Sequence, residues 1–301
     1  MLSVRATDVK GILREDFSLI KAVLLREEDV PADSLEVRLC ETGINELVKI
    51  ELLRDGEVIF EGDVDEQIEE ISQSSYTEII ARSCMARLID SEAYPMTLVN
   101  PSSRDIFRYF VKPCGFAEIS GEDRYYQGVF KVNKGISCYE AVKRFSMAVY
   151  GKLPYAEDKT LYIAGKEESG CAELLESSLL SFRKTYLRCE RLSEVFLKLK
   201  DTEGYNTPVK DSEAESLGVN RVRYVNASKG SSTPASYAEE ILKKSRAKSF
   251  CAQAEVMGFL SDIQGKDVKI TGSTEELYVS GVRCVLDKNT EKTRLTLKRR
   301  S

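Results

Sequence analysis

Residues 47–71 read LVKIELLRDGEVIFEGDVDEQIEEI and contain the clearest structural signal of the chain. Two apolar-rich segments flank Asp55-Gly56, a dipeptide that suits the positive φ angles of a tight β-hairpin turn. After the turn, hydrophobic and acidic residues alternate with a period of two, which predicts a strand with one face on a core and one in water. The predicted core face consists of Val58, Phe60, Val64 and Ile68. The predicted acidic face consists of Glu57, Glu61, Asp63, Asp65 and Glu69.

Further strand signals surround this hairpin. A serine-rich turn at residues 72–75 precedes an apolar segment, residues 76–82, which we expect to form another strand. Several strands separated by turn residues are typical of a small barrel or sandwich. We therefore assign residues 1–88 to a first β-rich domain.

The pattern changes to short helices after residue 90. Ser102 or Ser103 can cap a first helix, and Pro113 with Gly115 is expected to end it. Its apolar residues are Ile106, Phe107, Phe110 and Val111. The spacing of these residues indicates an amphipathic helix against a core rather than a nucleic-acid platform.

A second helix is predicted after Ser137, whose spacing to Glu140 fits a capping box. Its apolar stripe consists of Val142, Phe145 and Val149. Gly151 fits the end of this helix, and two short strands are predicted at residues 153–156 and 160–164. Residues 89–168 therefore form a predicted α/β insert.

Strand signals return in residues 169–301. Strands are predicted at 181–188, 195–200, 252–257, 268–271, 277–286 and 293–299. The polar stretch 201–218 is interpreted as a long loop, and 228–233 as a flexible excursion. Thr233 followed by Pro234 predicts a helix start, with Tyr237, Ala238, Ile241 and Leu242 on its buried side. This region is a second β-rich domain with a loop and helix insertion at about 203–250.

Composition limits the possible functions. The 301 residues are 42% hydrophobic and 31% charged, with a net charge of only −5, so the basic field of a dedicated nucleic-acid binder is missing. The N-terminal residues lack the apolar segment of a signal peptide, and no apolar run approaches the length that spans a bilayer. We therefore expect a protein made in a cytoplasm, without membrane insertion.

The residue types needed for common catalytic sites are missing. The chain has no histidine, which excludes Ser-His-Asp and Cys-His catalysis and the usual zinc sites. Its eight cysteines form no CxxC pair and are expected to be reduced thiols, several of them packed as small hydrophobic residues. No phosphate-binding loop motif is present. We predict no catalytic residue, no metal site and no cofactor. A carboxylate-pair glycosidase is the remaining enzymatic alternative.

Three segments resemble a known family. Residues 62–65 with 76–83 are similar to the end of the first barrel in phage late control protein D and tail-hub proteins. Residues 126–142, YQGVFKVNKGISCYEAV, resemble the extended segment, cap and helix that follow in that family. Residues 278–282, YVSGV, and the last strand, 294–299, resemble the closing hairpin of its second barrel. Together they identify the chain as a baseplate hub protein of the late control protein D and contractile-tail hub family.

The resemblance implies a β-rich α+β fold. It consists of two small antiparallel, tube-like β-barrels, an α/β insert between them and a helix-containing insertion in the second barrel. A homotrimer of such chains surrounds a channel with six barrels and joins a sixfold tail tube to a threefold spike. The chain has no room for a fused spike, lysozyme or peptidase domain, so the spike is expected to be a separate protein.

The implied role is that of a structural subunit of a virion tail baseplate, assembled in the host bacterial cytoplasm. The implied partners are the tail tube ring, the spike, the tape measure, a LysM-bearing tube initiator, wedge proteins and DNA in transit. The acidic face of Glu57, Glu61, Asp63, Asp65 and Glu69 is then a candidate channel wall that repels phosphates, or else an outer surface. The alternatives are a tail-associated cell-wall hydrolase and a carbohydrate- or peptide-binding tail module that uses the insert.

Overall fold

The structure, a computed structural model, describes residues 1–165, 170–199, 203–226, 234–272, 275–288 and 290–300. The chain divides into two compact units. Unit 1 consists of Met1–Ser169, Gly258–Asp262 and Val282–Thr293. Unit 2 consists of Gly170–Met257, Ile263–Gly281 and Arg294–Ser301.

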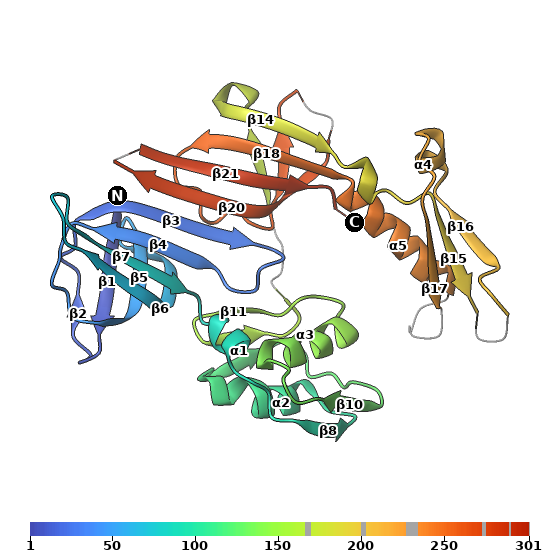
Figure 1. The fold of residues 1–301 in the computed structure, drawn as a ribbon, viewed down its shortest axis with the longest axis horizontal. Coiled ribbons are helices and arrows are strands. Elements are labelled where there is room, and N and C mark those ends of the chain that lie inside the picture. The colour runs from blue at the N-terminus through green and yellow to red at the C-terminus, as the bar shows by residue number, and fades with distance from the viewer. Residues whose placement is uncertain (166–169, 200–202, 227–233, 273–274, 289, 301) are drawn as a thin grey trace. The chain divides into compact units, whose positions relative to one another are not determined.

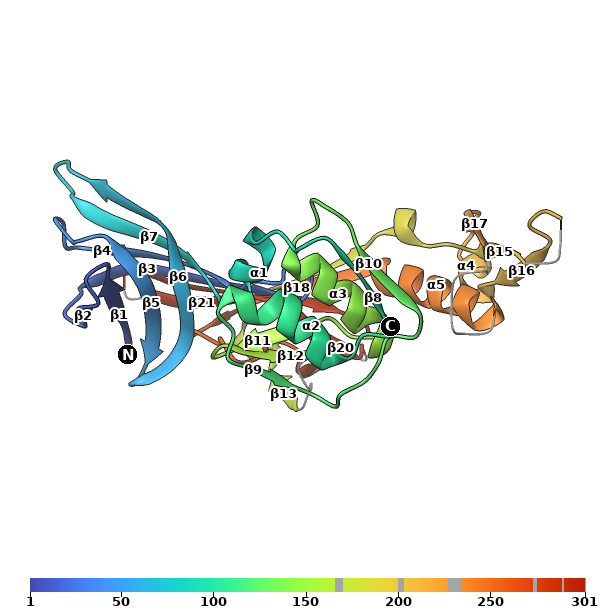
Figure 2. The same cartoon turned by 90° about the horizontal axis from the view of Figure 1, so that it is seen from below.

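The main element of unit 1 is a strongly curved sheet of its first seven strands (Figures 1 and 2). The strands are β1 (Leu2–Asp8), β2 (Leu13–Arg14), β3 (Leu19–Glu27), β4 (Ser34–Leu39), β5 (Leu47–Arg54), β6 (Glu57–Glu70) and β7 (Tyr76–Arg82). Their order is β3-β4-β7-β6-β5-β1-β2, and each neighbouring pair is antiparallel. β3 also neighbours β20 (Leu277–Asp287), whose residues from Val282 onward belong to unit 1.

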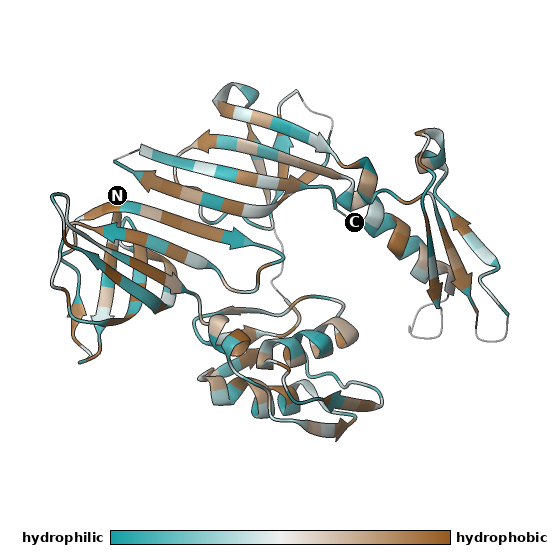
Figure 3. Ribbon diagram, in the orientation of Figure 1, coloured by the Kyte–Doolittle hydropathy of each residue, from teal (hydrophilic) through white to brown (hydrophobic). Residues whose placement is uncertain are grey.

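One face of this sheet is apolar and buried. Burial alternates strictly along β1, β4 and β7, and in β4 hydrophobic and hydrophilic residues alternate in the same way (Figure 3). Val37, Ile50, Leu52 and Ile79 are fully buried. The period of two that the sequence indicated is therefore the signal of a sheet with one buried face.

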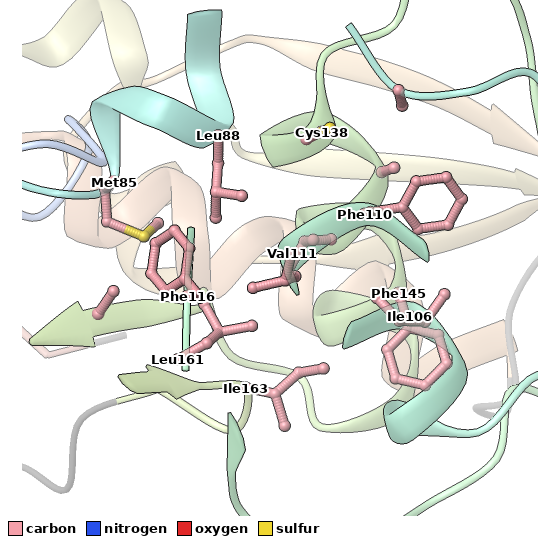
Figure 4. Close-up of a cluster of buried hydrophobic side chains, with 14 of the residues drawn as sticks. Met85, Leu88, Ile106, Phe110, Val111, Phe116, Cys138, Phe145, Leu161 and Ile163 are labelled. Atoms are coloured by element: carbon pink, nitrogen blue, oxygen red, sulfur yellow. The ribbon is translucent and has the colours of Figure 1, made fainter. Parts of the chain in front are cut away.

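The rest of unit 1 is mainly the α/β insert. Its helices are α1 (Ala86–Asp90), α2 (Ser103–Ile106), the π-helix η1 (Phe107–Val111), the 3₁₀-helix η2 (Lys112–Cys114) and α3 (Cys138–Val149). Its strands are β8 (Met96–Val99), β9 (Glu118–Ser120), β10 (Val129–Val132), β11 (Tyr155–Glu157) and β12 (Thr160–Tyr162). β8 pairs with β10, and β11, β12 and β9 form a three-stranded sheet. The insert has its own hydrophobic core, in which Phe110, Phe116, Phe145 and Leu161 converge (Figure 4).

Both predicted helix starts in the insert are confirmed. Ser102 caps α2 in a full capping box with Asp105, and Gly115 ends the following 3₁₀ turn at a φ of 87°. The Ser137 side chain accepts a hydrogen bond from the backbone N–H of Glu140, at 3.2 Å, and begins α3. These local signals work because each cap satisfies N–H groups that a helix start leaves without partners.

The main strands of unit 2 are β14 (Leu179–Tyr186), β18 (Phe250–Met257), β21 (Thr290–Lys298) from Arg294 onward and β20 up to Gly281. They follow one another in the order β14-β18-β21-β20 of the large sheet. β19 (Asp267–Ile270) pairs with β20, and β13 (Cys171–Leu174) pairs with β19. Two 3₁₀ turns, η3 (Glu176–Ser178) and η4 (Arg188–Glu190), flank β14. β14 is thus the end strand of this order.

An insertion between β14 and β18 forms a second small layer in unit 2. Its elements are β15 (Glu194–Lys198), β16 (Thr207–Lys210), α4 (Ser212–Ser216), β17 (Val222–Asn226) and α5 (Pro234–Lys248). Its sheet has the order β16-β15-β17, and Val195, Leu197, Ala238 and Leu242 form the core that it shares with α5. The predicted helix after Thr233 is therefore confirmed. The predicted flexible excursion at 228–233 lies outside the described residues.

The interpretation of residues 201–218 as a loop is wrong, because β16 and α4 lie within this stretch. The cause is a contact that is distant in sequence. Asp211 caps α4 through the N–H of Ala214 at 3.2 Å, and its carboxylate binds Arg191 at 3.2 Å and Arg246 at 3.0 Å. Polar composition suggested a solvated loop, whereas the Asp211 and Arg191 side chains are buried and form an ion pair, and Arg246, which is half exposed, also binds Asp211.

The fold is β-rich with a large, mainly antiparallel sheet and few helices, as predicted. Within the ranges given above, no helix is both long and apolar enough to cross a bilayer. All eight cysteines are free thiols, and Cys284 is fully buried, as expected of a small hydrophobic residue.

Candidate functional surface: an ion-paired face of the unit 1 sheet

The residue pairing shows which side chains share a face of the unit 1 sheet. Directly opposed residues of antiparallel strands lie on the same face. Leu52 lies opposite Val4 in β1 and Phe60 in β6, and all three are buried. The other face carries the residues between them, among them Glu51 and its partner Glu61.

Two extra residues interrupt the alternation of β6. Leu52 pairs with Phe60 but Leu53 pairs with Val58, so Ile59 has no partner on β5. Val64 pairs with Ala81 but Glu66 pairs with Ile80, so Asp65 has no partner on β7. Each extra residue is a β-bulge, and it moves the side chains beyond it to the opposite face of the sheet.

The bulges correct the predicted acidic face. Only Glu61 and Asp63, which lie between the two bulges, share the exposed face. Glu57 lies opposite Arg54, which is on the same face of β5 as the buried Leu52. Glu69 lies opposite the buried Thr77, so both glutamates lie on the other face of the sheet.

The predicted core face changes in the same way. Val58 and Ile68 are not core residues, since each is 45% exposed. Phe60 is buried as predicted, at 4% exposure. A period of two therefore describes only the part of β6 from Phe60 to Val64.

The first bulge is held by a residue from β3. Arg26 donates a hydrogen bond from Nη2 to the carbonyl oxygen of Ile59, at 2.6 Å, and pairs through Nε with Asp33 at 3.1 Å. Its Nη1 donates to the carbonyl oxygen of Ser261, also at 2.6 Å. Arg26 thus satisfies the carbonyl that the bulge leaves without a ladder partner. It also connects the 258–262 segment of unit 1 to β3 and β6.

Gly62 is required between the two bulges. A Cβ atom at this position would lie 2.5 Å from the carbonyl oxygen of Arg82 and 2.7 Å from the ring of Phe60. The Phe60 ring therefore covers the glycine, an arrangement in which an aromatic side chain shields a glycine in a strand.

Arginine–carboxylate pairs hold the second bulge. Arg82 binds Asp65 through Nε at 2.6 Å and Nη2 at 3.0 Å, and it also binds Asp90 at 2.7 Å. Arg87, in α1, binds Asp63 with two hydrogen bonds of 2.5 and 2.6 Å. The hydrogen bonds to Asp65 and Asp90 raise the pKa of Arg82, and those to Asp63 raise the pKa of Arg87. Such bidentate pairs fix direction as well as charge.

Ion pairs cross the rest of the exposed face. Arg38 and Glu78 are directly opposed on β4 and β7 and lie 3.0 Å apart. Lys49 contacts Glu61 at 2.8 Å, and although burial opposes it, hydrogen bonding and attraction to Glu61 raise the pKa of Lys49. Two further pairs are Arg5 with Glu51 and Lys21 with Glu36. We call this surface the ion-paired face: Arg5, Lys21, Glu36, Arg38, Lys49, Glu51, Glu61, Asp63, Glu78 and Arg82.

The chemistry of the ion-paired face is that of a matched, rigid surface. Its carboxylates have cationic partners, so none is set up as a free acid or base. The described part of the chain also holds no cluster of His, Cys, Asp or Glu arranged to bind a metal ion. The cations of this face were not predicted from the sequence. Lys49 does alternate with the core residues of β5, but its ion-pair partner is set by the strand register.

The fold belongs to a recognisable structural class. Its likeness is to phage tail proteins and to hub-like components of secretion and baseplate assemblies, and this confirms the resemblance that the sequence predicted. No family model and no curated protein sequence matches the chain.

Three solved structures illustrate this likeness. A tail protein from Neisseria meningitidis has a TM-score of 0.78 and 18% identity, covering 99% of this chain and 95% of that one. The 43 kDa tail protein of prophage MuSo2 from Shewanella oneidensis has a TM-score of 0.77 and 16% identity, covering 99% and 97%. An E. coli component of the type VI secretion system, described as similar to the T4 tail proteins gp27 and gp5, has a TM-score of 0.61 and 8% identity. That likeness covers 100% of this chain and 77% of the other. At these identities the likeness establishes the fold.

Proposed function

We propose that this protein is a structural hub subunit of a phage-type tail baseplate, which joins the tail tube to the central spike. The observation that carries the proposal is the fold likeness over nearly the full length of two phage tail proteins. Because the structural similarity covers almost the full length of both chains, it concerns the whole architecture. The neighbours are structural tail proteins, which favours a structural role over a catalytic one.

The proposed domains are a first barrel at 1–88, the α/β insert at 89–168 and a second barrel at 169–301. The strong curvature of the β1–β7 sheet supports closure into the first barrel (Figure 2). Unit 2 begins at Gly170 and contains β13, β14, β18, β19 and parts of β20 and β21, and this set of strands supports the second barrel. The β15–β17 layer and α5 form the insertion of the second barrel.

In the proposed assembly three subunits form a ring of six barrels around a channel. A ring of identical chains needs two different surfaces on each chain. End strands supply suitable surfaces: β14 ends the strand order of unit 2, and β2, only two residues long, ends that of unit 1. Leu180 and Tyr186 of β14 are 49% and 64% exposed. An open end strand with exposed apolar residues is normally covered by a partner.

We further propose that the ion-paired face lines the channel. Glu61 and Asp63 remain channel-lining candidates, and Asp65, at the second bulge, is a third. Glu57 and Glu69 lie on the other face of the sheet and are no longer candidates. Binding of DNA is driven largely by counterions that free cations release on meeting phosphates. A wall whose cations already bind carboxylates offers little of this gain, so DNA in transit does not adhere.

The proposed partners are a tail tube ring, a separate spike protein, the tape measure, a LysM-bearing tube initiator and wedge proteins. The proposed location is the tail of the virion, assembled in the bacterial host. The hub-like secretion component among the structural neighbours supports a role at the junction between tube and spike.

The assembly is tested by light scattering and negative-stain imaging of the purified chain, alone and with its spike protein. We expect a trimer, either at once or on addition of the spike. Leu180→Asp should abolish the trimer and leave the subunit folded. Leu217→Asp is the matched control, since Leu217 is 48% exposed on the insertion and should have no effect. A subunit that stays monomeric with spike and tube proteins present would contradict the hub proposal.

The channel wall is tested by adding cations to it. Glu36→Lys combined with Glu61→Lys should give the assembled ring salt-sensitive affinity for DNA, because each new phosphate contact adds a counterion-release term. The control is Glu57→Lys with Glu239→Lys, which makes the same charge change off the ion-paired face. Equal DNA affinity of the two variants would reject the channel-wall assignment.

A further inference from the structure

The small sheet β11-β12-β9 of the insert has one face on the core and one face that forms the floor of a pocket. Ala156 and Leu161 are directly opposed and buried, which defines the core face. Tyr155 and Tyr162 are directly opposed on the other face, and Ser120 pairs with Tyr162 from β9. These outward residues line a pocket of 420 Å³. This volume falls within the range of small-ligand sites, about 300–1,000 Å³.

The loops around the sheet leave room for this pocket. Gly121 and Gly165 both line it, with φ angles of 128° and 77° that L side chains rarely adopt. A Cβ at Gly165 would lie 2.8 Å from the carbonyl oxygen of Leu153. The backbone therefore turns tightly at two points of the rim, where it presents no side chains that could fill the space.

The floor of the pocket is aromatic. The rings of Tyr155 and Tyr162 lie 6.1 Å apart between centroids and are inclined at 40°. Burial, with a contribution from the nearby Glu157 carboxylate, raises the pKa of Tyr155. Its phenol is therefore protonated at neutral pH. The two tyrosine rings together offer an apolar surface with polar groups at its edge.

Two opposite charges complete the lining. Lys152 and Glu157 both border the pocket, and no described residue forms an ion pair with either of them. This differs from the ion-paired face, where Lys49 and Glu61 bind each other at 2.8 Å. A cation and an anion that have no ion-pair partner among the described residues, set around one aromatic floor, complement a ligand that carries both charges.

We propose that this pocket binds a short peptide. Its carboxylate contacts Lys152, its cationic group contacts Glu157, and an apolar side chain covers Tyr155 and Tyr162. The same chemistry is found in a free peptide with charged termini and in a protein segment with lysine and glutamate side chains. The proposal concerns the insert alone and does not depend on the hub role.

Titration calorimetry of the full chain with two peptides tests the proposal. The first is alanyl-phenylalanyl-alanine with free termini. The second is lysyl-phenylalanyl-glutamate with both termini capped. We expect at least one to bind with a dissociation constant on the order of 0.1 mM, typical of a small ligand of this size. Preference for the first identifies a free peptide as the source, and preference for the second identifies a protein segment.

Variants link the binding to the pocket. Tyr162→Ala should weaken it about ten-fold, and Lys152→Met about three- to five-fold, as exposed charge pairs do. Lys134→Met is the matched control on an exposed loop, and it should bind as the wild type does. Ser120→Tyr places a bulky ring on the pocket floor and should abolish binding with an unchanged unfolding midpoint.

The contact between the cationic group of the peptide and Glu157 is tested with the preferred peptide and with a version of it that lacks the cationic group. Glu157→Gln should weaken the intact peptide about three- to five-fold and the uncharged version not at all. Three results would overturn the proposal: no saturable binding of either peptide at 5 mM, binding that survives Ser120→Tyr, or equal losses for Lys152→Met and Lys134→Met.

Discussion

Helix α3 and strand β6 both carry strong periodic patterns in the sequence, yet only the helix has the faces that its pattern predicts. In α3, Val142 and Phe145 are fully buried and Ser137 is the cap, as expected. In β6 the alternation holds from Phe60 to Val64 and reverses on both sides. The two elements differ in what sets their faces.

The hydrogen bonds of a helix join residues four positions apart, so its faces follow from its own sequence. The faces of a strand depend on partner strands and on any extra residue in the ladder. In β6 those extra residues are held by Arg26, 33 positions away from Ile59, and by Arg82, 17 positions away from Asp65. No pattern within residues 57–70 indicates either contact.

The largest expected effect concerns the local element. Phe145 packs edge-on against Phe130, at 6.1 Å between centroids, in the core of the insert. Phe145→Ala should lower the free energy of unfolding by about 3–5 kcal/mol, the range for removing a buried aromatic side chain. Met147→Ala on the same helix is the control, because Met147 is 42% exposed and should change stability by less than about 0.5 kcal/mol. Chemical denaturation of both variants measures the difference, and similar losses would contradict the assigned face of α3.

The next effect concerns the non-local element. Arg26→Met removes the donor to the carbonyl oxygen of Ile59 and leaves Asp33 without this partner. We expect a loss of about 2–3 kcal/mol, as for hydrogen bonds that involve a charged group. Arg104→Met is the control, since the Arg104 side chain is 79% exposed. If the first bulge depends on Arg26, hydrogen exchange should also rise in residues 57–62. Unchanged exchange there, with normal stability, would show that the bulge forms without it.

A smaller effect tests how local the helix signal is. Ser137→Ala removes the side-chain acceptor for the N–H of Glu140 and should cost about 1 kcal/mol. Ser137→Asp should restore most of this stability, because aspartate accepts the same hydrogen bond. Thermal denaturation of the two variants provides the comparison. A loss of equal size in both would mean that the hydroxyl has a role other than capping.

The same distinction explains how much of the fold could be predicted. Turn residues, caps and helix stripes are local, so Asp55-Gly56, Ser102 and Ser137 gave the hairpin and two helix starts. The structure of residues 207–216 could not be predicted from its polar composition, because it depends on Arg191 and Arg246 binding Asp211.

The candidate surface was predicted only in part for the same reason. Glu61 and Asp63 lie on the exposed face as expected, but their cations come from β5 and α1. Arg54, which donates to the carbonyl oxygen of Phe259 at 2.8 Å, joins positions even further apart in sequence. An acidic pattern in one strand therefore gave the sign of the charges and missed their neutralisation.

The smallest expected effect is the coupling between Lys49 and Glu61, which distinguishes the ion-paired face from the other side of β6. A double-mutant cycle with Lys49→Met and Glu61→Gln should give a coupling of about 0.2–1 kcal/mol, the range for partly exposed ion pairs. The control cycle pairs Lys49→Met with Glu57→Gln. Its coupling should be near zero because Glu57 lies on the same face of the sheet as the buried Leu52, opposite to the face that carries Lys49.

The pH dependence of this ion pair has a definite sign. The folded pKa of Lys49 is raised, so the stabilisation is complete below its ordinary pKa of 10.5 and is lost as the pH rises through the folded value. Glu61→Gln should therefore begin alkaline unfolding at a lower pH than Glu57→Gln does, as followed by circular dichroism. Identical alkaline transitions in the two variants would place both carboxylates in equivalent surroundings and contradict the register shift at Ile59.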